Sequence, residues 1–163
     1  MAIDTANYQF CVKFPGSLEY IPAVRKFVSE TLLANNFDPK FTYRSEIIVD
    51  EICNNAVSFG CVSVDAVVEL QCMVHGDRIE FEIKDEGGKP DDLKRLTEAV
   101  KKRPRKGSPR DMGKKDSLGL EIVRMLSDQI TFETAANNLT TVRVVKLREE
   151  DGEAEGDEAA AAG

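Results

Sequence analysis

The pattern of apolar and polar positions predicts a strand followed by two helices in the first third of the chain. Residues 7–14 (NYQFCVKF) mix β-branched and aromatic side chains in rough alternation, which indicates an opening strand. From residue 18 to about 34, apolar residues recur every three or four positions, as on one face of a helix. After a short connection, residues 41–59 repeat that spacing, which predicts a second helix.

The rest of the chain alternates between strands and short helices. The segment 103–116 combines Pro, Gly and Ser with basic residues, which favours a loop. Antiparallel strands with helices grouped between them predict an α+β fold: a two-layer sandwich of a mixed, mainly antiparallel sheet with helices on one face. The predicted strands are 64–74, 78–84, 129–134 and 140–147, and the predicted helices are 91–102 and 118–127.

Charge divides the chain into a neutral domain and an acidic tail. The 163 residues suit one domain and carry 29 acids against 22 bases. Seven of the acids and none of the bases lie in 149–163, so the remaining acids and bases balance. We therefore expect a folded domain at 1–148 and a tail at 149–163 with the composition of a disordered segment. No folded segment has a broad basic surplus, which argues against direct nucleic-acid binding.

Several other features narrow the class of protein. No apolar run approaches the roughly 20 residues that span a bilayer, and the N-terminus lacks the features of a signal peptide, so we expect a cytoplasmic protein without a membrane partner. The four cysteines form no C-x-x-C pair, which favours reduced, mostly buried thiols over a metal site. The single histidine, His75, lies between two predicted strands, where a turn residue is expected. Triads based on histidine and most zinc chemistries are therefore disfavoured.

The second predicted helix carries the first candidate for chemistry. Glu51 and Asn55 are four residues apart, so they project from the same side of the helix. A carboxylate and an amide oxygen in this arrangement can share a hard cation and an attacking hydroxyl, and magnesium prefers oxygen ligands. Asp50 and Asn54 have the same spacing, so the register stays open, and a solvated helix face is the alternative. Glu51 and Asn55 are preferred because apolar residues follow Asn55 directly.

Asp85 is the second candidate, at the end of a predicted strand. Its carboxylate could accept a hydrogen bond from an exocyclic amine. Gly87 and Gly88 follow it, and glycines let a base or sugar approach the backbone closely. Taken alone, D-E-G-G is a turn sequence.

The third candidate is the start of the helix that follows the basic loop, at Ser117, Leu118, Gly119 and Leu120. A helix N-terminus offers free N–H groups to a phosphate, and Gly119 removes a side chain from that approach. Eight bases in 101–115 suit a polyanion, although a solvated basic loop is the alternative. There is no G-x-x-x-x-G-K-[ST] and no G-x-G-x-x-G, so neither a P-loop nor a dinucleotide fold is indicated.

Taken in order, these motifs resemble a known superfamily. The series E-I-C-N-N-A (51–56), D-E-G-G-K-P-D (85–91), S-L-G-L-E-I-V-R-M-L-S-D (117–128) and T-T-V-R-V (140–144) is similar to the histidine-kinase-type ATPases of the GHKL or Bergerat fold. Within that superfamily, the chain resembles the small bacterial anti-sigma factor serine kinases over residues 8–147. The resemblance implies an ATP- and Mg-dependent serine protein kinase that phosphorylates an anti-anti-sigma (STAS-type) antagonist, binds a sigma factor and forms a homodimer.

The resemblance also implies a role for each candidate residue. Glu51 would be the general base that takes a proton from the substrate serine, and Asn55 would hold magnesium. Asp85 would bind the adenine amine, and Thr140 would lie near the adenine on the floor of the sheet. The residues lining the nucleotide, under a lid formed by the basic loop, would be Gly87, Gly88, Ser117, Leu118, Gly119 and Leu120.

Four departures from the family pattern favour an alternative function. The first glycine box, usually D-x-G-x-G, is one residue short here, and Ser117 replaces the first glycine of G-x-G-L. Phe59 stands where histidine is frequent, and Leu139 stands where glycine is usual. The alternative is a nucleotide-binding partner-switch module with little or no kinase turnover. A more remote reading is a general ATPase or a detached sensor-kinase domain.

Overall fold

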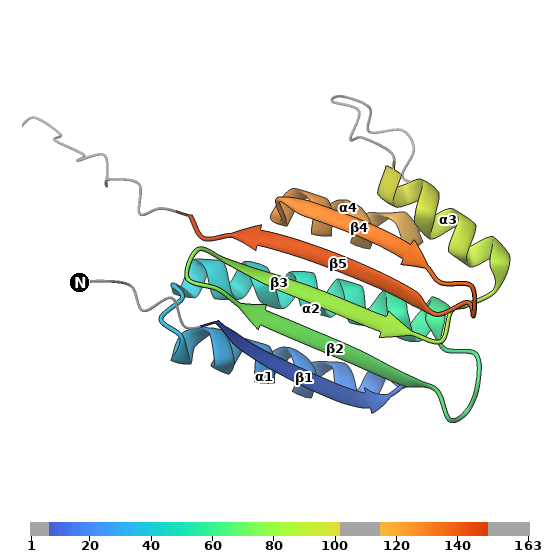
Figure 1. The fold of residues 1–163 in the computed structure, drawn as a ribbon, viewed down its shortest axis with the longest axis horizontal. Helices are drawn as coiled ribbons and strands as arrows, with labels where there is room; N and C mark the ends of the chain where they lie inside the picture. The colour runs from blue at the N-terminus through green and yellow to red at the C-terminus, as the bar shows by residue number, and fades with distance from the viewer. Residues whose placement is uncertain (1–6, 102–114, 150–163) are drawn as a thin grey trace, which may run out of the picture.

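One sheet with helices on one of its faces makes up the protein (Figure 1). The computed structural model describes residues 7–101 and 115–149. The elements are β1 (Tyr8–Pro15), the 3-10 turn η1 (Leu18–Tyr20), α1 (Ile21–Ala34), α2 (Pro39–Gly60), β2 (Val67–Val74), β3 (Arg78–Asp85), α3 (Pro90–Lys101), α4 (Lys115–Leu126), β4 (Gln129–Thr134) and β5 (Thr140–Leu147).

The strand order is β1-β2-β3-β5-β4, and the predicted α+β sandwich is confirmed. The pairings within the described sheet are antiparallel throughout, so it contains no parallel pair of the kind that a mixed sheet would have. Tight turns connect β2 to β3 and β4 to β5, which makes those pairs antiparallel. The segment containing α3 and α4 then brings β5 back beside β3.

The core lies between the sheet and the helices. On β3, Ile79, Phe81 and Ile83 alternate toward the helices and are almost fully buried. Helix α2 crosses the middle of the sheet, with α1 on one side and α4 on the other (Figure 1). The same alternation places Asp85, the last residue of β3, on the helix-covered face. A carboxylate is thus carried to the end of the core beneath α2.

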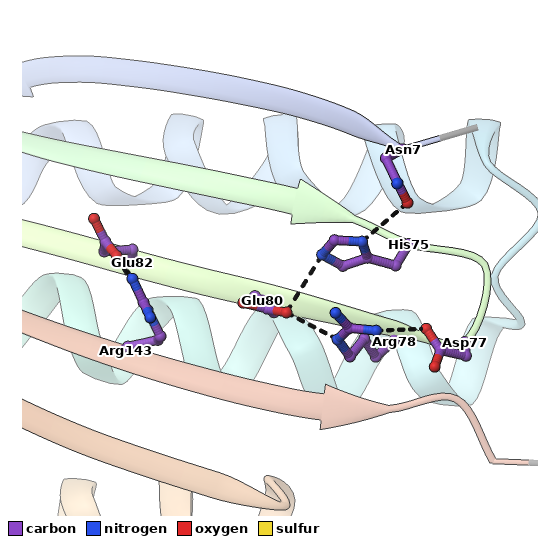
Figure 2. Close-up of polar contacts among 7 residues, drawn as sticks. All are labelled: Asn7, His75, Asp77, Arg78, Glu80, Glu82 and Arg143. Carbon is purple, nitrogen blue, oxygen red and sulfur yellow. Dashed lines mark hydrogen bonds and ion pairs between the residues drawn. The ribbon is translucent and has the colours of Figure 1, made fainter. Parts of the chain in front are cut away.

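The opposite face of the sheet is polar. At the turn after β2, His75 Nδ1 lies 3.0 Å from Asn7 Oδ1, and His75 Nε2 lies 3.3 Å from Glu80 Oε1 (Figure 2). Further along β3, Glu82 pairs with Arg143 of β5 (Figure 2). These contacts place His75 in the predicted turn, between Asn7 and Glu80.

Several boundaries differ from the sequence prediction. Strand β2 begins at Val67 rather than at residue 64, because β1 ends at Pro15 and Val67 is the residue paired with it. Val64 is fully exposed, at 102% of its reference area. Helix α4 begins at Lys115, so Ser117 lies within its first turn rather than at its start. Of the predicted basic loop, 103–116, residues 103–114 lie outside the described residues, and the last two belong to α4.

The predicted acidic tail is described only at its first residue. Glu149 forms ion pairs with Arg44, near the start of α2, and with Lys40 at 3.9 Å. Residues 150–163 lie outside the described part of the chain, so the division into 1–148 and 149–163 stays a prediction. None of the described helices is long and apolar enough to cross a membrane.

The cysteines are free, and their exposure differs. Cys53 and Cys72 are buried, Cys61 is half-buried and Cys11 is exposed. Burial raises the pKa of Cys53 and of Cys72 to about 12. The two buried thiols are therefore protonated and behave as small apolar core residues.

Candidate functional site

A small pocket, with a cavity volume of about 20 Å³, lies between α2, the sheet and α4. Most of its wall is apolar, and the two polar residues are Asn55 and Asp85. Apolar walls with a few convergent polar groups are typical of small-molecule sites. The apolar lining consists of Ile52, Ala56, Ile83, Leu120, Phe132 and Val142.

Asp85 is buried at one end of this pocket, with 7% of its surface exposed. Oδ1 accepts hydrogen bonds from the Thr140 hydroxyl and, at 2.8 Å, from the Gly87 backbone N–H. Burial raises the pKa of the Asp85 carboxyl, and these two hydrogen bonds partly oppose that rise. A Cβ on Gly60, the last residue of α2, would lie 2.1 Å from Asp85 Cγ, so this glycine makes room for the carboxyl group. Sequence reasoning missed Gly60, although a glycine at a helix end is a recognisable signal.

The two glycines after Asp85 pack against the protein's own backbone. Gly87 has a φ of +80°, and a Cβ there would lie 1.6 Å from the Asn138 carbonyl oxygen. A Cβ on Gly88 would lie 1.6 Å from the carbonyl oxygen of Phe59. The turn is therefore held between the end of α2 and the β4–β5 turn. Neither glycine lines the pocket, and their predicted contact with a nucleotide stays a prediction.

The two registers that the sequence left open have different surroundings on α2. Asn54 Nδ2 donates to the backbone oxygen of Asp50 at 2.7 Å and to its side-chain Oδ2 at 3.2 Å. Arg25 of α1 holds the other carboxylate oxygen, with Nη1 at 3.2 Å from Asp50 Oδ1. Asn55 lines the pocket, and its Nδ2 is buried without a hydrogen-bond partner among the described residues. A buried amide without a partner is costly, so Asn55 is the one available to a ligand.

Glu51 lies one helical turn before Asn55 and against α4. It is half-buried, and a Cβ on Gly119 would be 2.3 Å from Glu51 Oε2. Burial raises the pKa of the Glu51 carboxyl, and the charge of Asp50 raises it further. A carboxylate with increased proton affinity is better suited to remove a proton from a hydroxyl group.

The N-terminal half of α4 contributes to the same site. Gly119 and Leu120 are buried, and Leu120 lines the pocket. Ser117 and Leu118 lie in the first turn of the helix. Backbone N–H groups in a first turn lack partners within the helix, so they can bind an anion. The predicted contact of residues 117–120 with phosphate stays a prediction.

The floor of the pocket is a cross-strand pair that sequence reasoning did not assign to the site. Phe132 of β4 and Val142 of β5 are direct partners and face the helices. Both were predicted to lie in strands, and strand alternation indicates which face they share. Their position under a pocket depends on α4 lying above them, which no local pattern reveals.

The donor groups fit Mg-ATP better than a metal held by protein alone. No cluster of three or more His, Cys, Asp or Glu that could hold a metal ion occurs among residues 7–101 and 115–149. Magnesium keeps several waters and can be held by one side chain together with phosphate oxygens. The amide of Asn55 is suited to that role, and the apolar walls and Asp85 are suited to an adenine ring.

Sequence comparison decides the family. A profile of the histidine kinase-like ATPase domain matches residues 14–146, a range that contains every candidate residue discussed above. The chain belongs to this family. Membership of the histidine kinase-like ATPase domain family implies ATP binding and suggests ATP-dependent kinase activity. No curated protein gives a significant match.

Two solved structures share the fold of this histidine kinase-like domain at low sequence identity. The RsbU and RsbW domains of Rv1364c from Mycobacterium tuberculosis align with a TM-score of 0.60 and 15% identity, over 88% of this chain and 33% of that chain. A chain of the SiaB-SiaC complex from Pseudomonas aeruginosa aligns with a TM-score of 0.64 and 14% identity, over 83% of this chain and 88% of that one. The present chain thus spans about a third of the Mycobacterium chain.

Proposed function

We propose that this ATPase-family domain is a serine protein kinase that phosphorylates an anti-anti-sigma antagonist of the STAS type and regulates transcription through a sigma factor. The observation that carries the proposal is the position of Asn55, which lines the pocket one helical turn from Glu51, with its Nδ2 buried and without a hydrogen-bond partner among the described residues. Nδ2 can donate a hydrogen bond to a ligand, while the amide Oδ1 is the atom suited to a metal, on the same side of the helix as the Glu51 carboxylate.

Each residue has a distinct task in the proposed reaction. Asp85 accepts a hydrogen bond from the adenine amine, and the apolar walls exclude water from the ring. Asn55 would hold magnesium through its amide oxygen, and the metal would offset the negative charge of the phosphate groups. Glu51 accepts the proton of the substrate serine hydroxyl as the hydroxyl oxygen attacks the γ-phosphorus of ATP. The bond from that phosphorus to the β,γ-bridging oxygen breaks, and ADP leaves.

The choice of partners is supported by the resemblance of the motifs and by the two structural neighbours. One neighbour contains an RsbW domain, and the other is part of a complex between two proteins. A domain that binds both an antagonist and a sigma factor can switch between them if nucleotide binding changes its conformation. The same resemblance supports a homodimer and a cytoplasmic location.

A nucleotide-binding partner-switch module with little turnover is the second candidate. Ser117 replaces a family glycine, and the first glycine box is one residue short. The space beside Gly87 and Gly88 is filled by the backbone of Asn138 and Phe59. These glycines therefore have a packing role that would be retained in a domain without catalytic turnover.

Transfer of labelled phosphate separates the two candidates. The protein is incubated with γ-labelled ATP, magnesium and a panel of STAS-type proteins, alongside Glu51→Gln and a control, Glu46→Gln, on the same helix. Label on a serine that is lost in Glu51→Gln, with ATP affinity retained, supports the kinase. ATP binding without transfer to any panel member supports the module. Failure of the wild-type protein to bind Mg-ATP in calorimetry would reject both.

A further inference from the structure

The missing side chain of Gly119 leaves the space that the Glu51 carboxylate occupies. A Cβ on Gly119 would lie 2.3 Å from Glu51 Oε2 and 3.3 Å from Cδ, and apart from its chain neighbours and the nearby backbone of α4 it would meet no other described atom within 4 Å. Glycine is a poor helix former, so its place inside α4 calls for a packing or functional reason. Contact with the carboxylate of Glu51 supplies such a reason.

Helix α4 is held in place on the C-terminal side of this contact. After Gly119, Leu120 and Val123 are buried, with 3% and 0% of their surfaces exposed. At the end of the helix, the ammonium group of Lys146 on β5 donates to the Leu126 carbonyl oxygen at 2.9 Å, where a cation is favourable. Helix α4 also packs directly on α2, and the carboxylate of Glu51 lies against the backbone at Gly119.

We propose that Gly119 is a positioning residue for Glu51, so that the docking of α4 on α2 determines where the general base lies. The kinetic consequences of this inference rest on the proposed kinase function. The contact between Gly119 and Glu51 does not depend on that function. An added methyl group would meet the far end of a flexible side chain, so Glu51 can rotate away and the protein can still fold. The competing role for Gly119 is to admit a phosphate, as the sequence motif suggested.

Thermal unfolding tests the contact without reference to activity. Gly119→Ala is made in the wild-type protein and in a Glu51→Ala background. Alanine is the better helix former, so in the Glu51→Ala background we expect the melting temperature to rise by about 3 °C. In the wild-type background the displaced carboxylate should reduce that gain to about 1 °C or less. An equal change of the melting temperature in both backgrounds would show that Gly119 does not contact Glu51, whether or not the protein is a kinase.

Kinetics test the positioning role. We expect Gly119→Ala to lower kcat for serine phosphorylation at least about tenfold while the Kd for Mg-ATP changes less than about threefold. Glu51→Asp shortens the side chain by one methylene, which withdraws the carboxylate from the methyl group that Gly119→Ala adds. The kcat of the double variant should therefore be less than about threefold below that of Glu51→Asp alone. Met125→Ala, on the exposed side of the same helix at 82% exposure, is the control and should change neither quantity.

Two kinetic outcomes would reject the inference. A large loss of Mg-ATP affinity in Gly119→Ala with kcat retained would assign the glycine to phosphate binding. Equal losses of kcat in the wild-type and Glu51→Asp backgrounds would show that the methyl group acts independently of Glu51. If the wild-type protein transfers no phosphate, the proposed function fails. The thermal unfolding of Gly119→Ala in the two backgrounds still tests whether Gly119 contacts Glu51.

Discussion

The hydroxyl group of Thr140 donates a hydrogen bond to Asp85 Oδ1 from the directly opposite position on the neighbouring strand. The Gly87 backbone N–H donates to the same oxygen. Both hydrogen bonds that the described residues make to this carboxylate thus fall on Oδ1. Oδ2 is the oxygen that remains to accept a hydrogen bond from an amine of a bound base.

Asp85→Asn should stabilise the protein at neutral pH and weaken nucleotide binding. Burial raises the folded-state pKa of Asp85 above its ordinary value, so the folded state binds the proton more tightly than the unfolded state does. Stability contributed by this group is therefore lost as pH rises from the ordinary pKa through the raised one. Asparagine keeps an acceptor for Thr140 without the charge. We expect a higher melting temperature than wild type at pH 7, a smaller difference near pH 4, and at least about tenfold weaker ATP binding.

The control for that prediction is Asp77→Asn, which removes an exposed carboxylate at the β2–β3 turn. Its melting temperature should stay within about 1 °C of wild type at both pH values, because surface charges contribute little. A lower melting temperature of Asp85→Asn at pH 7 would mean that the hydrogen bonds to the charged carboxylate outweigh the cost of its burial.

Asn55→Ala should weaken Mg-ATP binding without destabilising the fold. We expect a loss on the order of 1–3 kcal/mol in calorimetry, roughly 5- to 150-fold, because a metal ligand is removed. Asn55 Nδ2 has no hydrogen-bond partner among the described residues, so the loss of this nitrogen breaks no hydrogen bond within them. Asn54→Ala is the matched control: it breaks the contact with Asp50 and should leave Mg-ATP affinity within about threefold. The reverse result would assign the metal to Asn54.

The sequence could predict the elements but not the choice between the two registers on α2. Helical and strand periodicity depend on local alternation, which is why the sandwich and most boundaries follow from the sequence. Asp50 with Asn54 and Glu51 with Asn55 have the same spacing, so the difference between them depends on long-range packing. Arg25, about two dozen residues earlier, binds Asp50, and α4 packs against Glu51.

The missing glycine at position 139 also shows what the sequence alone could not predict. Leu139 stands where glycine is usual in the family that the motifs resemble, and the sequence alone could not say how the turn forms without it. In the structure Asn138 has the positive φ, at 66°, and the turn closes with the Ala135 N–H donating to the Leu139 carbonyl oxygen at 2.9 Å. Asparagine tolerates this conformation better than other residues with a side chain, so the turn can form without the glycine.

Asp50→Asn should shift the pH dependence of the proposed phosphorylation. Burial, and then the charge of Asp50, raise the pKa of Glu51, and a protonated Glu51 cannot accept the serine proton. Removing the Asp50 charge lowers that pKa, so the fall in rate on the acid side should move to lower pH, with Mg-ATP affinity within about threefold of wild type. Initial rates measured against pH provide the test, with Glu46→Gln as the comparison on the same helix. A shift toward higher pH would mean that Asp50 acts on Glu51 through packing rather than through its charge.

Gly87→Ala should destabilise the fold and thereby disturb the site. At a φ of +80° an L side chain is strained, and its Cβ would lie 1.6 Å from the Asn138 carbonyl oxygen, which belongs to the backbone and cannot move independently. We expect the free energy of unfolding to fall by about 2 kcal/mol or more, measured by urea denaturation. Asn138→Gly changes the other side of the same contact without adding an atom, so its effect should be within about 1 kcal/mol.

Because the Gly87 N–H also donates to Asp85 Oδ1, loss of this turn should weaken ATP binding in parallel with stability. Near-normal stability of Gly87→Ala with reduced ATP affinity would instead indicate that the glycine contacts the nucleotide directly.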